Sequence, residues 1–165
     1  MTGVSASITV QDSALRAELA RLQAHLTNLT PVMRSIGQTL RTNIDLGFRG
    51  EQDPWGVPWR PLSDVTLRRR RGTSAQILRD TGRLANSMTY RADRNSVSVG
   101  TNVVYAATHQ FGAQKGDFGR TRRGAPIPWG DIPARPMLPI RNSLVDLPPE
   151  WRADVLATLA RYLTP

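Results

Sequence analysis

Residues 87–100 read SMTYRADRNSVSVG and contain the clearest strand pattern of the chain. Polar and apolar residues alternate over 87–91 and again over 96–100, which is the period of a half-buried β-strand. Residues 93–95, Asp-Arg-Asn, separate the two runs and favour a turn. The segment therefore predicts an antiparallel β-hairpin with a short loop.

Upstream of the hairpin, apolar residues recur at helical spacing in two stretches. The first follows Asp12, a good N-cap residue, and consists of Leu15, Leu19, Leu22, Leu26 and Leu29. The second follows Thr30-Pro31, a typical helix start, ends at Gly47 and Gly50, and consists of Met33, Ile36, Leu40, Ile44 and Phe48. They predict a helix pair, or one long helix bent at Pro31. Because two heptads are too few to establish a coiled coil, we expect the leucines to pack on the domain's own sheet.

Downstream of the hairpin, Pro148-Pro149-Glu150 opens a further helix. Its expected apolar face consists of Trp151, Val155, Leu156, Leu159 and Leu163. Shorter helices are expected over 64–71, with Ser63 or Asp64 as the cap, and over 102–112. Residues 136–140, which contain two prolines, suit an edge strand.

These elements predict a single α+β domain over residues 1–165. A small antiparallel sheet is packed by a long N-terminal helix or helix pair and by a C-terminal helix, with long Pro/Gly-rich loops. The length of 165 residues fits one domain. Hydrophobic residues make up 39% of the chain and charged residues 21%, which is not the composition of a disordered protein. Twelve prolines and thirteen glycines predict the long loops.

Two loops contain residues of interest. Residues 50–61, GEQDPWGVPWRP, place Trp55 and Trp59 in an irregular segment, where they either fill the domain's own core or anchor a partner. Residues 112–130 hold five glycines and are expected to form an exposed, mobile basic loop, whose cations are Lys115, Arg120, Arg122 and Arg123. Turns that a β-carbon would strain are expected at Gly82, Gly100 and Gly112.

The charge balance is strongly basic. Twenty-two basic residues stand against thirteen acidic ones, which gives a net charge of +9. A run of four arginines, Arg68, Arg69, Arg70 and Arg71, has three interpretations: a solvated helix end, a contact to phosphate backbone, or a contact to an acidic protein surface. No aromatic residue is interleaved with this run, which argues against stacking on single-stranded nucleic acid. The charge alone also suits a free nucleic-acid-binding protein without sequence specificity.

No arrangement of residues predicts enzymatic chemistry, a cofactor or a metal. Cysteine is absent, which excludes a thiol nucleophile, a disulfide and a thiolate metal site. Of the two histidines, His25 is expected to flank the apolar face of its helix, and His109 is interpreted as a packed or interfacial residue. Glu51 and Asp53 lie close in sequence, but a Pro/Gly loop does not promise the burial that paired catalytic carboxylates need. The chain shows no secretory signal pattern and no apolar run of the roughly 18–20 residues that a membrane span requires, so we expect no membrane association.

Five short blocks occur in a recognisable order: Asp53-Pro54-Trp55-Gly56 with Trp59; ILRDTGRL over 77–84 with Ser87; Val99-Gly100-Thr101; Tyr105-Ala106 with His109-Gln110-Phe111-Gly112; and IPARPML over 132–138. In this order they resemble the phage virion morphogenesis family, also called the tail completion family of tailed bacteriophages. They are also similar to the wider group of head–tail joining and tail terminator proteins. The resemblance spans about Asp12 to Leu163, with Met137 where the family often has phenylalanine.

The resemblance implies a structural virion protein of the neck, which completes the tail or joins it to the head as a ring around the DNA channel. It implies an α+β subunit, no enzyme activity and no cofactor. The expected partners are further copies in a homo-oligomeric ring, by family analogy a hexamer, together with head connector or neck proteins and tail tube or terminator proteins. Non-specific contact with channel DNA is also expected. The place of action is the virion, at the neck or tail top, after assembly in the host cytoplasm; the alternative is an assembly factor absent from the finished particle.

The expected subunit or partner interface consists of Trp55, Trp59, Pro133, Arg135, Pro136, Met137 and Leu138. Prolines of fixed geometry lower the entropy lost when such a segment docks. Arg135 is expected to make a charge-assisted bond to a carboxylate or carbonyl of a neighbour, and the alternative is a bond within the chain to Asp80 or Asp131. The arginine run and the cations of residues 112–130 are expected to carry the electrostatic contacts.

Overall fold

The computed structural model describes residues 28–70 and 75–163. Its helices are α2 (Thr30–Gly50), α3 (Asp64–Arg69), α4 (Arg83–Asn86), α5 (Ala106–Phe111) and α6 (Pro149–Leu163). Its strands are β1 (Thr89–Ala92), β2 (Val97–Gly100), β3 (Ile140–Arg141) and β4 (Leu144–Val145). The expected leucine stripe up to Leu26, together with His25 and Arg71, lies outside the described residues.

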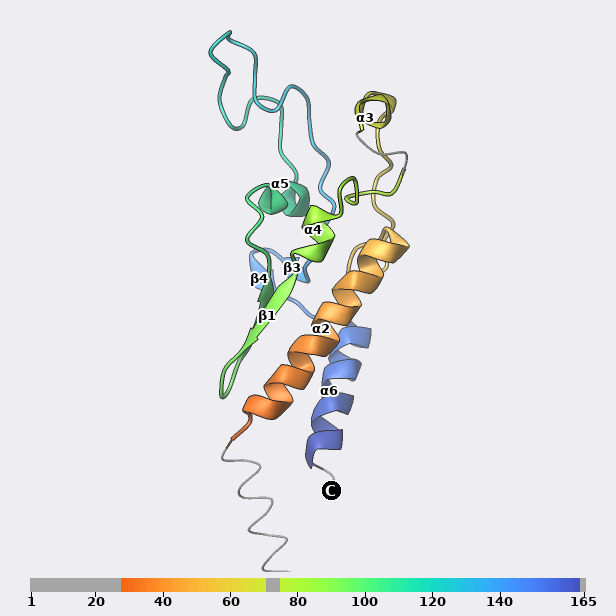
Figure 1. Ribbon diagram of the computed structural model, residues 1–165, viewed down its shortest axis with the longest axis vertical. Coiled ribbons are helices and arrows are strands. Elements are labelled where there is room, and N and C mark those ends of the chain that lie inside the picture. The colour runs from red at the N-terminus through yellow and green to blue at the C-terminus, as the bar shows by residue number, and fades with distance from the viewer. Residues whose placement is uncertain (1–27, 71–74, 164–165) are drawn as a thin grey trace, which may run out of the picture.

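The expected α+β fold is confirmed. Helix α2 packs against the β1–β2 hairpin and against α6 (Figure 1). The two strands pair antiparallel, with Thr89 opposite Gly100 and Ala92 opposite Val97. The Asp93 amide donates to the Ser96 carbonyl at 2.8 Å and closes the predicted turn. Two residues at the start of the alternating run precede the strand: Ser87 is the C-cap of the short helix α4, and Met88 links that helix to β1.

Helix α2 forms where the periodicity predicts it. Pro31 lies in the first turn, where its missing N–H is not needed, although Thr30 is already helical and supplies no side-chain cap. The buried face consists of Val32, Ile36, Gly37, Leu40, Ile44 and Phe48. Val32 was not expected on this face, and Met33 beside it is only partly buried. Gly37 has a packing reason, because a β-carbon there would overlap the ring of Tyr90 on the hairpin.

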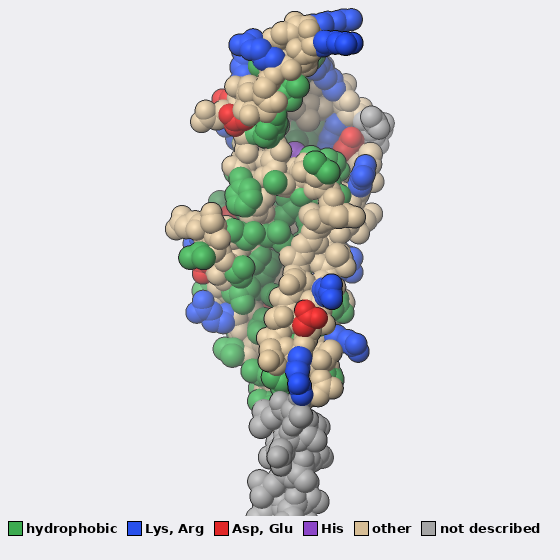
Figure 2. Space-filling view, turned by 90° about the vertical axis from the view of Figure 1, so that its left-hand side faces the viewer, with side chains coloured by type: hydrophobic (Ala, Val, Ile, Leu, Met, Phe, Trp, Pro, Cys, Tyr) green, Lys and Arg blue, Asp and Glu red, His purple; other side chains and the backbone are tan. Residues whose placement is uncertain are grey.

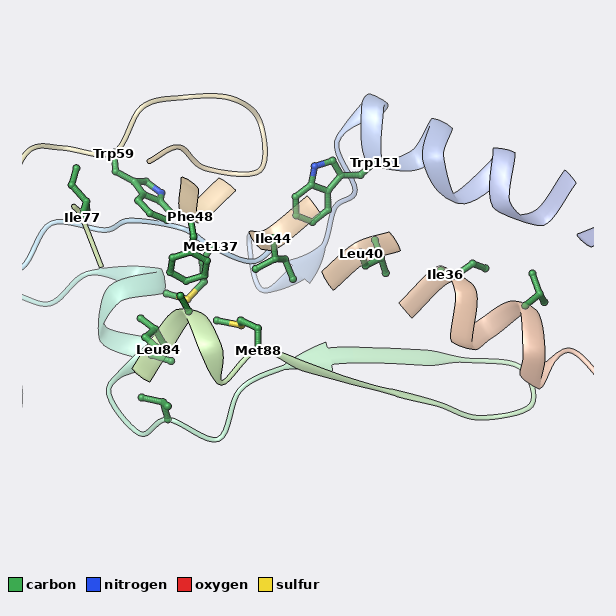
Figure 3. Close-up of a cluster of buried hydrophobic side chains, with 14 residues drawn as sticks. Ile36, Leu40, Ile44, Phe48, Trp59, Ile77, Leu84, Met88, Met137 and Trp151 are labelled. Carbon is green, nitrogen blue, oxygen red and sulfur yellow. The ribbon is translucent and has the colours of Figure 1, made fainter. Parts of the chain in front are cut away.

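The hydrophobic core lies between α2, the hairpin, α6 and two loop segments (Figure 3). Trp59 fills this core, with 5% of its surface exposed and its ring edge-to-face with Phe48 at 5.5 Å between centroids. Its indole Nε1 donates to the carbonyl of Pro136 at 2.8 Å. Trp59 therefore fills the domain's own core, which is one of the two roles expected for it, and the buried ring fixes the path of residues 50–61.

The C-terminal helix is correctly placed, but its packed face is rotated relative to the expected one. Trp151 and Thr158 are buried on α6, whereas Leu156 is 58% exposed. The expectation that Leu156 packs inward is therefore wrong. Thr158 can be buried because its hydroxyl donates to the carbonyl of Asp154 at 2.8 Å.

The edge strand expected at residues 136–140 is also wrong in its extent. Only Ile140–Arg141 is a strand, and it pairs with Leu144–Val145 in a second small sheet. The amides of Met137 and Leu138 donate instead to the side chain of Gln110, at 2.9 and 3.0 Å. A side chain thus occupies the hydrogen-bonding groups that a neighbouring strand would need.

Two of the three expected glycine turns are confirmed. Gly82 and Gly112 have φ of 75° and 78°, a region that favours glycine. Gly100 instead ends strand β2 with ordinary backbone geometry, and nothing lies within 4 Å of the site of a β-carbon. Its expected role as a turn is therefore wrong. Within the described residues, no helix has both the length and the apolar character needed to cross a membrane.

Candidate docking site

Residues 112–130 are exposed, as expected, but they are folded on themselves. We define the arm as residues 113–132. At its base, Ala113 and Ile132 exchange backbone hydrogen bonds of 3.0 and 2.7 Å. Farther out, the Phe118 amide donates to Ile127 at 2.8 Å and the Thr121 amide donates to Ala125 at 2.8 Å. The arm is therefore a hairpin-like projection with its own hydrogen bonds rather than a featureless loop.

The arm and α3 lie at the same end of the molecule (Figure 1). Between them is an open cleft of about 1570 Å³, lined by residues of α3, of the base of the arm, and of α4 and α5. We call residues 60–70 and 113–135 the forked end, because α3 and the arm form its two prongs. Nothing in the local sequence of either prong indicates that they face one another.

The α3 prong is a surface helix with no buried residue. The hydroxyl of Ser63 accepts from the Thr66 amide at 3.3 Å, which confirms Ser63 as the N-cap. Arg68 and Arg69 lie exposed in the last turn, where a cation suits the helix dipole. Arg70 turns inward: its side chain is only 7% exposed and donates to the Gln76 carbonyl at 2.6 Å. The arginine run is thus divided between surface and structural positions.

The arm carries its cations outward. Lys115, Arg120, Arg122 and Arg123 are all exposed, and Figure 2 shows Lys and Arg side chains gathered at the upper end of the molecule. The two acids of this region are engaged locally. Asp117 accepts from the Gln114 amide at 2.6 Å, and Asp131 accepts from the Lys115 amide at 2.8 Å. The carboxylates shape the backbone while the cations face solvent.

Exposed apolar residues are interleaved with these cations, and the sequence interpretation did not single them out. Trp129 is 63% exposed, Phe118 56% and Ile127 37%. The Arg69 guanidinium lies 6.0 Å from the centroid of the Trp129 ring, so the two prongs approach one another there. In the sequence, the sign of this exposed apolar surface is the presence of a tryptophan, a phenylalanine and an isoleucine inside a Gly/Arg-rich loop.

Arg135 lies beneath the cleft and is 6% exposed. Its Nε donates to the Arg60 carbonyl at 2.9 Å and its Nη2 to the Pro61 carbonyl at 3.1 Å. The expected bond to a carbonyl therefore exists, but within the chain, and it involves neither Asp80 nor Asp131. Burial, and then the charge of Arg60, lower the pKa of Arg135 from its usual value. The guanidinium fixes the loop that leads into α3.

His109 packs edge-to-face on Tyr105 at 5.9 Å between ring centroids. Burial, and then the charge of Arg135, lower its pKa. Its Nδ1 is buried and has no hydrogen-bond partner among the described residues. It lines the cleft, as do Arg60 and Arg83, and the carboxylates of Asp80, Asp117 and Asp131 line the cleft too.

The remaining expected interface residues serve mainly the chain's own structure. Met137 is 3% exposed, and the carbonyl of Pro136 accepts from Trp59. Leu138 is partly buried against the core. Together with Trp59 and Arg135, these side chains are largely covered by the chain itself, and the expected interface stays a prediction. Pro133 lines the cleft and stays accessible.

Trp55 has a different environment from Trp59. It is half-buried, and the Arg141 guanidinium lies 3.7 Å from the centroid of its ring. Gln110 is a buried polar residue that the sequence interpretation did not single out. Besides accepting from Met137 and Leu138, its Nε2 donates to the Leu138 carbonyl at 3.0 Å. This single side chain attaches α5 to the segment that runs toward β3.

The two carboxylates of residues 50–61, Glu51 and Asp53, also have partners within the chain. Glu51 accepts from the Ile77 amide at 2.8 Å, and Asp53 accepts from the amides of Trp55 and Val57, both at 2.9 Å. Over residues 28–70 and 75–163, no group of three or more acidic or histidine side chains is placed to hold a metal ion. What the forked end offers chemically is a cationic and apolar surface for binding.

Comparison with known proteins matches the chain to a family and to one curated relative. The model of the phage virion morphogenesis family matches residues 10–163. The chain is 34% identical over 149 residues to Mu-like prophage FluMu G protein 2 of Haemophilus influenzae. The aligned residues make up 90% of this chain and 88% of that protein. No solved structure matches the chain. The family match over nearly the whole chain supports a role in phage virion morphogenesis, and the chain belongs to the phage virion morphogenesis family.

Proposed function

We propose that this protein is a structural component of the virion neck, which completes the tail or joins it to the head as a ring around the DNA channel. The observation that carries the proposal is the forked end. A lone subunit leaves Trp129 and Phe118 in water among four exposed arm cations. Exposed apolar surface of this kind marks an interaction site. A family role in building the virion gives that site its setting.

A ring is consistent with the shape of the subunit. Closed rings are built from heterologous contacts, in which two different surfaces of each subunit meet. The β3–β4 hairpin exposes Leu144 and Val145, at 71% and 77%, and Val104 before α5 is 94% exposed. Hydrophobic side chains also gather over the middle of the face in Figure 2. These surfaces are separate from the cations of the arm. We propose a hexamer, by analogy with the family, contacting head connector or neck proteins and tail tube or terminator proteins.

Deletion of the gene in the phage tests this function. We expect separate filled heads and tails in electron micrographs, and restoration of whole particles when the protein is supplied from a plasmid. Tagged protein should then label the neck of purified virions. Labelling elsewhere on the particle, or a normal yield of joined particles without the gene, would contradict the proposal. Joined particles that lack the protein by mass spectrometry would favour an assembly factor instead.

Net positive charge favours a second candidate function, a free nucleic-acid-binding protein. This candidate predicts a monomer that binds duplex DNA with steep salt dependence and plays no part in head–tail joining. Size-exclusion chromatography and a DNA titration at several salt concentrations, set beside the deletion phenotype, separate the two functions.

A further inference from the structure

We propose that the forked end binds an acidic segment of a partner protein, one that carries apolar side chains next to its carboxylates. The inference rests on the proposed neck function for its setting and adds the chemistry of the partner. Three features of the described residues support it: the charge of the forked end, the apolar side chains among its cations, and the form of the cleft.

The charge of the forked end requires an anionic occupant. Residues 60–70 and 113–135 contain nine basic residues and three acidic ones, a net charge of +6. Two of the acids, Asp117 and Asp131, already accept backbone hydrogen bonds. A second copy of this end is a poor occupant, because each copy of the forked end carries +6 and like charges repel. The partner must bring carboxylates or phosphates.

The apolar residues decide between these two anions. Contacts to a duplex backbone come from cations, hydroxyls and amides, and they give no role to exposed aromatic rings. Protein interfaces, in contrast, are enriched in tryptophan, tyrosine and arginine at the positions that contribute most to binding. Trp129 and Phe118 are both more than half exposed, and Arg69 lies against the Trp129 ring, which is that combination. The surface fits a carboxylate-bearing protein better than duplex DNA.

The cleft has the dimensions of a binding site for a chain segment. Its volume of about 1570 Å³ exceeds the roughly 300–1,000 Å³ of small-molecule pockets. Arg60 and Arg83 line the cleft and are exposed, whereas Asp80, which also lines it, is paired with Arg70. A peptide carboxylate entering between the prongs could pair with the exposed guanidinium groups of Arg60 and Arg83. Its apolar side chains would cover Trp129 and Phe118.

Photo-cross-linking in assembling phage tests the proposal directly. We would introduce p-benzoylphenylalanine in place of Trp129 and, as a matched control, in place of Leu156, which is 58% exposed on α6. After irradiation, mass spectrometry identifies the segment attached at each position. We expect position 129 to attach to an Asp/Glu-rich segment of another virion protein. Attachment to DNA, to another copy of this chain, or to a basic segment, or no product above the control, would overturn the proposal.

A charge-matched pair of variants gives a second readout. One variant carries Arg120→Ser, Arg122→Ser and Arg123→Ser; its control carries Arg34→Ser, Arg91→Ser and Arg152→Ser, which are exposed positions on α2, β1 and α6. Both lose three positive charges, and circular dichroism would confirm that both fold. We expect head–tail joining in extracts to fall at least about tenfold for the arm variant and to change little for the control. Equal effects would show that net charge, not the forked end, matters.

The two proposals fail in distinguishable ways. If the protein is absent from the neck but position 129 attaches to an acidic segment of some other virion protein, the neck function is wrong and the forked-end inference stands. If the protein labels the neck but position 129 attaches to DNA, the function stands and the inference is overturned.

Discussion

Gly112 is the residue at which the arm leaves α5, and Gly112→Ala gives the sharpest test of the structure. Its φ and ψ of 78° and 179° fall in a region open essentially to glycine alone. A β-carbon would also lie 2.9 Å from the Ile132 carbonyl oxygen and 3.0 Å from the Ala134 nitrogen. Both neighbours are backbone atoms, so they can move only if the pairing of Ala113 with Ile132 is disturbed.

The expected cost is the sum of two effects. The backbone conformation costs about 1–3 kcal/mol for a non-glycine residue, and weakening one backbone hydrogen bond adds about 1 kcal/mol. A total of about 2–4 kcal/mol should lower the Tm by roughly 5–15 °C in a chain of this size. Thermal unfolding followed by circular dichroism measures the shift.

Two other glycines separate the effects. Gly124 has φ of 79° but open space around the β-carbon position, so Gly124→Ala should show the conformational cost alone. Gly130 has neither feature, so Gly130→Ala should stay within about 0.5 kcal/mol of the parent protein. The reasoning is refuted if Gly112→Ala and Gly130→Ala melt at the same temperature.

Three further predictions concern the core and the site. Gln110→Met should lower the free energy of unfolding, measured by urea titration, by about 3 kcal/mol, because three backbone groups lose their partner. The same change at the exposed Gln38 should be nearly neutral. Ile44→Ala should lower the free energy of unfolding by about 2–5 kcal/mol, because Ile44 is 2% exposed. Leu46→Ala, on the exposed side of the same helix, should lower it far less in the same assay. The pKa of His109 is lowered in the folded state, so from about pH 6.5 down to the folded-state pKa the unfolded chain binds this proton more readily than the folded chain. Stability falls as pH decreases through that range, by at most about 1.4 kcal/mol per pH unit. Melts between pH 7 and pH 5 should show a shallower decline for His109→Gln, and an unchanged slope would contradict the burial of this ring.

The elements that could be predicted are those that depend on neighbours in the sequence. The stripe from Ile36 to Phe48 places α2, because one helix face repeats every three or four residues. The two alternating runs place the hairpin, and Ser63 marks the start of α3. At the start of α2 the prediction is off by one residue, because Val32 is buried where Met33 was expected. The periodicity does not constrain which residue faces inward at an end of the pattern.

The residues for which prediction failed are those whose partners are far along the chain. For Trp59 the sequence favoured core filling but left a partner contact open, and the tertiary structure decides for the core, with the indole donating to the carbonyl of Pro136. Leu156 fits a helical stripe as well as Val155 does, and only the position of α2 decides which of them is covered. The proline-rich segment resembles an edge strand locally, but the amide of Gln110 takes its hydrogen-bonding groups.

The candidate site shows the same division. By itself the sequence determined the family, the strong positive charge and the two basic segments, since these are properties of composition and of short blocks in order. Only the tertiary structure decided that α3 and the arm face one another across a cleft, with Arg69 near Trp129 and Arg135 beneath. The physical reason is that a contact between residues sixty positions apart depends on how the core packs between them, and local propensity does not encode that packing.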